Sequence, residues 1–454
     1  MISEKRNLDK SILLLAAPAI INNITVPLLG LCDTTIAGHL GSPRYLASIS
    51  VGTMMLNVFF WLAGFLRMGT TGLTARSVGR GSYMQCREVL MKSLLIAGVI
   101  SLIVLACQNS LLTLLLRFLA PGSDAAELAG RYFRIGVWWV PAQLTIMAVS
   151  GWFIGLQTTV IPMTIAIGTN VINIAASVLF VFGIKRGFDG IAYGTLVANW
   201  IGAIAALCWA LVRLKEEKKK LATKRGEEER EYDETTKMEL KGDRIKWSEF
   251  FKVNSALFIR SACIMAVTLT VTSVGSQLGE LTLAANAVIM QFFLFFSYFM
   301  DGFAFSGEAL AGKFSGAGDG EMVIKTMKSL CRWGAVMALI FLALYTFGSK
   351  TMAQLITDSA EVVNKIEEYR LWIQLLPPVT VSAFIFDGLF VGLTRTRAMM
   401  WVTIAGAALF FTILFGSNIP HTNNLLWLSF ESYLFVRGAA LAVTFFYTVV
   451  GKRG

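Results

Sequence analysis

The sequence has little of the charge that soluble proteins carry. Only 15% of its 454 residues are charged, whereas 55% are hydrophobic. A typical soluble domain has about 25% charged residues, so this composition excludes an ordinary soluble domain. Apolar stretches of about 20 residues or more recur along the chain, and each is long enough to cross a bilayer. The sequence therefore predicts an all-α polytopic membrane protein.

The chain is also poor in residues that hold metals or carry out catalysis. Its two histidines, His39 and His421, fall far apart in predicted outer loops. The six cysteines lie in or beside apolar stretches without a CxxC pair, so we interpret them as packing residues. The motifs GxxxxGK[ST], GxSxG and HExxH are missing. We predict no enzyme activity, no cofactor and no resident metal, and an ion gradient rather than ATP as the energy source.

Positive charge is distributed unevenly between the loops. The formal net charge is +11, but lysine and arginine concentrate in alternate loops and at both termini. This is the positive-inside bias of a membrane protein and does not indicate a nucleic-acid partner. We therefore expect a multi-pass protein with both termini in the cytoplasm. No small-residue cleavage site follows the first apolar run, so we interpret that run as a membrane helix and not a signal peptide.

About twelve spans can be counted. They cover, roughly, 11–36, 44–70, 90–116, 132–156, 160–184, 189–212, 250–275, 281–311, 330–350, 366–392, 398–416 and 425–450. One long hydrophilic stretch predicts an N-terminal lobe of 1–212, a charged cytoplasmic linker of 213–247 and a C-terminal lobe of 248–454. The mixed charges of this linker fit either an exposed helix or a flexible tether.

The two halves of the chain are related. Three pairs of glycines share one constant offset in the numbering: Gly79 and Gly316, Gly151 and Gly388, Gly155 and Gly392. A constant offset over such a distance indicates a duplicated six-helix unit. Because each repeat has an even number of spans, both have the same orientation, related by an axis along the membrane normal. The predicted fold is two six-helix lobes related by a pseudo-twofold along that normal.

The first predicted span carries one acid, Asp33, and two prolines, Pro18 and Pro27. A carboxylate at membrane depth is costly and usually functional. Proline removes a backbone donor and bends a helix. A bent helix with a buried acid suits a protein whose conformational change is driven by protons or cations. The alternative is that Asp33 lies at the water interface and merely ends the helix.

Further polar residues of the first half fall at a similar depth to Asp33. They are Asn170, Asn173 and Ser177 in the fifth span and Thr195 in the sixth. Together with Asp33 they are candidates for a proton-coupling site. A Na⁺ ion bound by Asp33, Asn173 and Thr195 is the alternative, since neutral oxygens and a single carboxylate suit either ion. Ordinary hydrogen bonding between membrane helices also accounts for each amide or hydroxyl taken singly.

The second half carries a charged cluster of its own. Asn254 and Arg260 lie in the seventh span, Asp301 and Glu308 in the eighth, and Asp387 in the tenth. Counted from the cytoplasmic ends, Arg260, Asp301 and Asp387 lie at similar depth, which predicts one arginine between two acids and a net negative cluster. This cluster is either a structural ion-pair clamp or a second titrating or substrate-binding site. Glu308 is expected nearer to the membrane–water interface.

Several motifs resemble one transporter family. They are PAIINNITVPLLGLCDTTIAGHLG (18–41), FLRMGTTGLTARSVGRG (65–81), GWFIGLQTTVIPM (151–163), MDGFAFSGEALAGKFSGAG (300–318) and FDGLFVGLTRTRAMM (386–400). In order and over nearly the whole chain, they resemble the DinF-like branch of the MATE family, the multidrug and toxic-compound extrusion transporters. The resemblance implies twelve helices in two lobes. It also implies export of organic, often cationic and amphipathic compounds in exchange for H⁺ or Na⁺.

The resemblance also assigns roles to single residues. The key acid of the family falls on Asp33, its bending proline on Pro18, its helix 5 pair on Asn173 and Ser177, and its helix 6 hydroxyl on Thr195. Many relatives have aspartate where this chain has Ser177, which argues against a fully formed cation shell. DinF-like proteins are generally proton-coupled. The second-half charges of the branch fall on Arg260, Asp301, Glu308 and Asp387.

We therefore expect an H⁺-coupled multidrug antiporter in the bacterial cytoplasmic membrane. Its partners would be small organic cations or other amphipathic drugs and the lipid bilayer. We expect a monomer, because one chain supplies both lobes. A Na⁺-coupled antiporter of the same fold and a lipid-linked substrate flippase are the alternatives within the superfamily. A membrane-embedded enzyme and a passive channel are the alternatives outside it.

Overall fold

The computed structural model describes residues 2–40, 42–119, 123–228, 244–416 and 422–451. Within these ranges the regular structure is helical and no strand is present. Twelve helical segments of the described chain are long and apolar enough to cross a membrane. Each of them overlaps one of the twelve predicted spans, so the prediction of an all-α polytopic membrane protein is confirmed.

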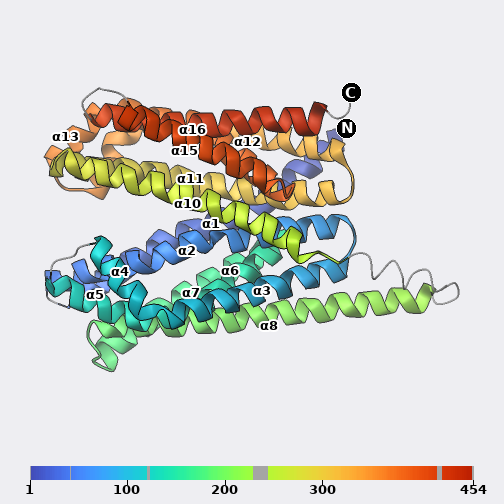
Figure 1. Cartoon of the computed structure of the whole chain (residues 1–454), viewed down its shortest axis with the longest axis horizontal. Coiled ribbons are helices and arrows are strands. Elements are labelled where there is room, and N and C mark those ends of the chain that lie inside the picture. The colour runs from blue at the N-terminus through green and yellow to red at the C-terminus, as the bar shows by residue number, and fades with distance from the viewer. Residues whose placement is uncertain (1, 41, 120–122, 229–243, 417–421, 452–454) are drawn as a thin grey trace. The chain divides into compact units, whose positions relative to one another are not determined.

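Apart from the stretch between α8 and α10, the helices follow one another with short connections (Figure 1). The first half contains α1 (Ile2–Gly38), α2 (Pro43–Gly79), α3 (Tyr83–Ala106), α4 (Gln108–Leu119), α5 (Ser123–Gly136), α6 (Val140–Gly155), α7 (Val160–Val178) and α8 (Asp189–Glu228). The second half contains α10 (Trp247–Gln277), α11 (Glu280–Gly316), α12 (Gly320–Ile356), α13 (Ala360–Glu368), α14 (Arg370–Gly392), α15 (Thr396–Gly416) and α16 (Asn423–Phe445).

The chain forms two compact units, which we call the first and the second unit. The first unit is Ile21–Phe250, and the second unit is Met1–Ile20 together with Phe251–Gly454. Two helices therefore pass from one unit into the other: α1 after Ile20 and α10 after Phe250. The lobe and linker boundaries expected from the sequence stay a prediction.

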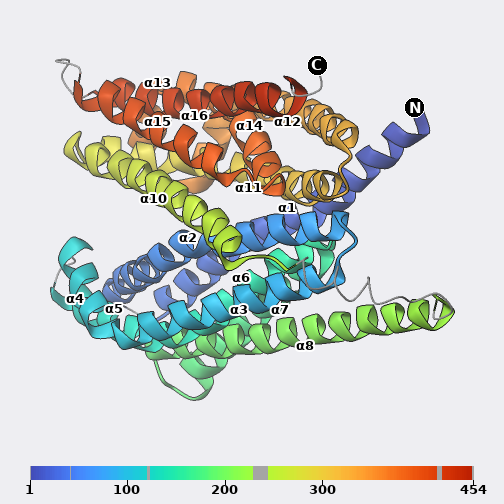
Figure 2. The same cartoon turned by 45° about the vertical axis from the view of Figure 1, so that its right-hand side comes forward.

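Helix α8 is longer than its predicted span. It continues through the charged sequence to Glu228 and is visible in both views as a single long helix (Figures 1 and 2). Arg213 pairs with Glu216 at 3.3 Å and with Glu217 at 3.0 Å, and pairs at this spacing stabilise a helix in water. The first part of the predicted linker is therefore an extension of α8, whereas residues 229–243 lie outside the described residues.

Glycines bring pairs of helices into close contact in the first unit. A Cβ added to Gly151 of α6 would lie 2.3 Å from the carbonyl oxygen of Arg67 in α2. One added to Gly155 would lie 2.8 Å from the carbonyl oxygen of Thr71. Only glycine lets the α6 backbone approach α2 this closely, as small residues do in membrane bundles.

The same contact recurs in the second unit, between α14 and α11. A Cβ on Gly388 would lie 2.4 Å from the carbonyl oxygen of Ala304, and one on Gly392 would lie 2.5 Å from that of Glu308. Ala304 and Glu308 follow Arg67 and Thr71 at the same offset that relates the glycines themselves. Helices α2 and α11 are also equal in length. The repeat inferred from glycine spacing therefore extends to residue-by-residue packing.

We predict that Gly151→Ala and Gly388→Ala destabilise the protein by similar amounts. Overpacking a close contact typically costs about 1–3 kcal/mol. The measurement is the apparent melting temperature of the purified protein in detergent. Gly98→Ala is the matched control, because a Cβ there would meet nothing within 4 Å. A Gly151→Ala variant as stable as the Gly98→Ala control would contradict the close α2–α6 contact.

Candidate functional site

Asp33 is a half-buried acid near the end of α1. Its Oδ1 is fully buried and has no hydrogen-bond partner among the described residues. Helix α1 continues for another turn to Gly38, so Asp33 does not end the helix. A buried carboxyl oxygen without a partner in an apolar span is costly, which marks Asp33 as a candidate for function.

The side chain of Tyr132, in α5, lies within electrostatic reach of Asp33. Its hydroxyl neighbours the side chains of Thr53 and Thr195, and it lies close enough to Asp33 to sense its charge. The ring is buried against Trp139, with ring centroids 5.7 Å apart. A Cβ on Gly52 would lie 2.6 Å from this ring. Glycine at position 52 thus makes room for Tyr132 next to the acid.

Three predicted site residues form a hydrogen-bonded chain between α7 and α8. The Ser177 hydroxyl donates to Asn173 Oδ1 at 3.1 Å, and Asn173 Nδ2 donates to Thr195 Oγ1 at 3.1 Å. Thr195 in turn donates to the carbonyl of Ile191 at 3.1 Å. A Cβ on Gly194 would lie 2.3 Å from Ser177 Oγ, so this glycine allows the close approach of α8. Because Tyr132 also neighbours Thr195, the chain extends towards Asp33.

Asn170 connects the same helix to α1. Its Nδ2 donates to the carbonyl of Thr25 at 3.4 Å, and the Thr25 hydroxyl donates to the carbonyl of Asn22 at 2.7 Å. Pro18 and Pro27 both lie within α1, which is helical from Ile2 to Gly38. That the helix bends at these prolines stays a prediction.

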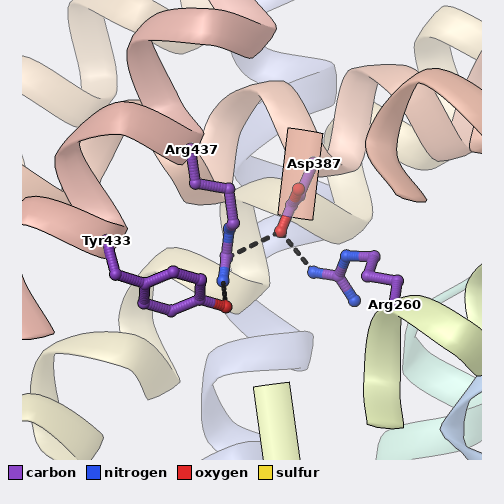
Figure 3. A network of polar contacts seen from close by, with 4 residues as sticks. All are labelled: Arg260, Asp387, Tyr433 and Arg437. Atoms are coloured by element: carbon purple, nitrogen blue, oxygen red, sulfur yellow. Dashed lines mark hydrogen bonds and ion pairs between the residues drawn. The ribbon is translucent and has the colours of Figure 1, made fainter. Parts of the chain in front are cut away.

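The second unit holds a compact ionic network (Figure 3). Asp387 of α14 lies between two arginines, and its Oδ2 accepts from Arg260 of α10 and, at 2.8 Å, from Arg437 of α16. Arg437 also donates to the hydroxyl of Tyr433 at 3.1 Å. All four side chains are buried. One carboxylate therefore ties together three membrane helices.

Sequence comparison identifies the family of the chain. The pattern of the MatE family matches residues 18–179 and 256–415, which is most of the chain. The chain belongs to the MATE family. The two matched ranges also correspond to the two halves related by the glycine repeat.

Curated MATE relatives align along much of the chain. The DNA damage-inducible protein F of Escherichia coli is 32% identical over 96% of this chain and 91% of its own length. A probable multidrug resistance protein NorM of Bacillus cereus is 24% identical over 62% of this chain and 60% of its own length. The predicted resemblance to the DinF-like branch is confirmed, and the relatives are transporters rather than enzymes, as predicted.

Solved MATE structures share the fold. A crystal structure of a MATE transporter in the bent conformation gives a TM-score of 0.81 at 15% identity and covers 98% of this chain and 96% of that chain. The Vibrio cholerae MATE transporter VcmN in the bent form gives 0.80 at 14% identity and covers 99% of each chain. At these identities the likeness shows the fold alone. The chain is thus a multi-pass MATE protein.

The second-half cluster of this MATE protein contains a base that the prediction left out. The pairing of Arg260 with Asp387 is as expected from their similar depth. Arg437, to which the sequence assigned no partner, also reaches Asp387 from α16. Asp387 therefore pairs with two arginines, whereas the sequence predicted one arginine between two acids. The predicted net negative charge of the whole cluster stays a prediction.

The other members of the predicted cluster lie on the helices that were expected to carry them. Asn254 is buried in α10, Glu308 is buried in α11, and Asp301 is half-buried in α11. The burial of Glu308 places it inside the protein rather than at an exposed surface. Which of these groups titrate stays a prediction.

Two further groups were missed by the sequence analysis. Tyr132 is one, since nothing in the sequence of its span distinguishes it from other buried aromatics. The other is a buried set in the second unit, where Asn286 and Asn423 exchange amide hydrogen bonds at 2.7 and 2.9 Å. Trp427 donates to Asn286 at 2.8 Å. The only available signal was an asparagine inside an apolar span, which is weak.

We predict that Asp387→Asn strongly destabilises the protein. Removing this charge takes the shared carboxylate from two buried guanidinium groups, and breaking a buried pair typically costs about 3–5 kcal/mol. Glu368→Gln is the control, because Glu368 is largely exposed in its pair with Lys365 and such pairs are worth about 0–1 kcal/mol. Both variants are compared by thermal unfolding in detergent. Equal stability of the two would refute the role of Asp387 as the tie between α10, α14 and α16.

Proposed function

We propose that this chain is a secondary active transporter that exports organic, often cationic and amphipathic compounds in exchange for H⁺ by alternating access. The observation that carries the proposal is the buried oxygen of Asp33, which lies in a membrane helix and has no hydrogen-bond partner in the part of the chain that the structure describes. The probable multidrug resistance relative supports export of drugs as the direction of transport.

The proposed chemistry is a change in hydrogen bonding at Asp33. An ionised carboxylate only accepts hydrogen bonds, whereas a protonated one also donates. The hydroxyl of Tyr132, which lies within electrostatic reach of Asp33, either donates or accepts, so it accommodates both states. Loss of the proton creates a charge that attracts a cationic substrate, and its return removes that attraction. Proton and substrate therefore compete, which is the requirement of an antiporter.

The neutral oxygens of Asn173 and Thr195 already take part in hydrogen bonds, which favours H⁺ over Na⁺ as the coupling ion. Asn173 Oδ1 already accepts from Ser177, and Thr195 Oγ1 accepts from Asn173 while donating to a backbone carbonyl. Each of these oxygens keeps one lone pair, so a cation would have to share its ligands with the existing hydrogen bonds. A proton on Asp33 requires no such sharing.

The location follows from the same proposal. A proton gradient of suitable direction lies across the bacterial cytoplasmic membrane, and the distribution of positive residues supports an orientation with both termini on its cytoplasmic side. We propose a monomer as the working form, because a single chain contains both compact units.

We predict that Asp33→Asn abolishes proton-driven export. Asparagine preserves the size of the side chain but cannot gain or lose a proton, so the exchange loses its coupling ion. The measurement is efflux of a fluorescent cationic dye from vesicles that contain purified protein, under a pH gradient or a Na⁺ gradient imposed separately. Wild type should respond to the pH gradient, and the variant should not.

Asp358→Asn serves as the matched control for this assay. Asp358 is an exposed aspartate in the connection between α12 and α13, and its substitution should leave efflux unchanged. Normal pH-driven efflux by well-folded Asp33→Asn protein would overturn the proposed switch. Efflux driven only by Na⁺ would overturn proton coupling and direct attention to Asn173 and Thr195 as ion ligands.

A further inference from the structure

Glu431 is a buried acid that the proposed function does not use. It lies in α16, in a segment long and apolar enough to cross a membrane, and the residue is only 4% exposed. Its Oε1 is fully buried and has no hydrogen-bond partner among the described residues, and no described base forms an ion pair with it. An ionised carboxylate in this place would have nothing to stabilise its charge, which is the costly state in an apolar span.

The nearest base along α16 already has partners. Arg437 pairs with Asp387 at 2.8 Å and donates to the hydroxyl of Tyr433 at 3.1 Å (Figure 3). Six positions separate Glu431 from Arg437, so the two residues lie about 9 Å apart along the helix axis and roughly 120° apart around it. Arg437 therefore belongs to the network of Asp387 and does not neutralise Glu431.

The helices around α16 supply no charge to Glu431 either. Helix α16 packs against α14 and α15 and is hydrogen-bonded to α11 through Asn286. The charged residues of these helices are Arg370 and Asp387 in α14, Arg397 in α15, and Glu280, Asp301, Glu308 and Lys313 in α11. Burial, without a neighbouring charge, sets the electrostatic surroundings of Glu431. This acid is thus an isolated carboxyl group in the described part of the chain.

Two contacts show which part of α14 lies opposite Glu431. Positions 424, 431 and 438 are seven apart, so they form one stripe along α16. At one end of this stripe, Asn424 Oδ1 accepts from Trp372 Nε1 at 2.9 Å. At the other end, a Cβ on Gly438 would lie 2.8 Å from the backbone nitrogen of Ala383. Glu431 is halfway between the two contacts, so it faces the middle of the α14 segment from Trp372 to Ala383.

Two successive prolines, Pro377 and Pro378, form the middle of that segment, inside α14. Proline has no N–H, so the carbonyls of Ile373 and Gln374 lose the donor that a helix normally provides four residues later. In an apolar span such acceptors need a donor from another group. A protonated carboxyl group has an O–H to donate, whereas a carboxylate only accepts. Only the protonated form of Glu431 is therefore complementary to this part of α14.

We propose that Glu431 and the α14 backbone at Pro377 and Pro378 form a proton-binding site in the second unit, and that this site holds a proton. The proton removes the charge from the acid and lets it donate to a carbonyl oxygen that the prolines leave free. One proton thereby satisfies buried groups on two helices. Unlike the proton proposed for Asp33, it stays bound, because its loss would set a carboxylate against carbonyl oxygens. The site is separate from the proposed switch and does not depend on it.

Infrared difference spectroscopy tests whether Glu431 is protonated. Spectra of purified wild type and Glu431→Gln are recorded in detergent at neutral pH and subtracted. We expect wild type to show the carbonyl stretching band of a protonated carboxyl group and Glu431→Gln to lack part of it. The matched control is Glu368→Gln, because Glu368 is largely exposed and paired with Lys365. Its difference spectrum should show the bands of a carboxylate instead.

Two outcomes of this experiment would overturn the proposal. One is a difference spectrum of Glu431→Gln that shows the loss of a carboxylate, as in the control. The other is failure of Glu431→Gln to fold while Glu368→Gln folds, because the glutamine amide has nearly the same size and also donates to a carbonyl.

A double-mutant cycle tests whether the proline segment is the acceptor. Glu431→Leu removes the donor and leaves the free carbonyls unsatisfied, so it should lower the apparent melting temperature in detergent by a few degrees. In Pro377→Ala/Pro378→Ala protein, both carbonyls regain their helix donors, and the same leucine substitution should lower it much less. An equal effect in the two backgrounds would overturn the assignment of the α14 backbone as the partner of Glu431.

Discussion

The low dielectric constant of the bilayer is the constraint on which this structure depends. A polar group inside an apolar span has no water to bond, so it must find a partner in the protein. Backbone groups satisfy this within the helices, many hydroxyls donate to a carbonyl one turn earlier in their own helix, and other polar side chains bond across helices. The hydrogen-bonded chain from Ser177 through Asn173 to Thr195 is one such solution, and the paired amides of Asn286 and Asn423 are another. Asp33, with a buried oxygen that has no partner in the described part of the chain, has not been satisfied in this way.

The two repeats use the same helix framework for different electrostatics. In the first unit Asp33 lies within electrostatic reach of the neutral Tyr132, so a proton added to or removed from the acid changes the net charge of the site. In the second unit the carboxylate of Asp387 is shared by Arg260 and Arg437, and these charges hold each other in place. The glycine contacts are duplicated while the polar groups have diverged. In our proposal, the first unit carries the proton switch, Asp33, and the second unit carries the ion pairs of Asp387, which hold its helices together.

The sequence was sufficient wherever a property depends on neighbours along the chain. Apolar length predicted the twelve spans, and glycine spacing predicted the repeat, whose contacts between α6 and α2 and between α14 and α11 follow the same offset. Asn173 and Ser177 are one turn apart in the sequence, and a hydrogen bond joins them on one face of α7.

Periodicity does not say which helix a face meets. The partnership of Asp387 with Arg437, 50 residues away, and the proximity of Tyr132 to Asp33 therefore could not be predicted. The attachment of Asp9 to Ser329, 320 residues away, was hidden for the same reason.

Proton release on substrate binding tests the central claim most directly. Purified protein in weakly buffered detergent solution is mixed with a cationic dye while a pH indicator records the protons released. If substrate and proton compete for Asp33, wild type should release about one proton per dye molecule bound at a pH where the carboxyl is protonated, by linkage. Asp33→Asn protein should release none. Equal proton release by both proteins would contradict the account, because the proton would then come from another group.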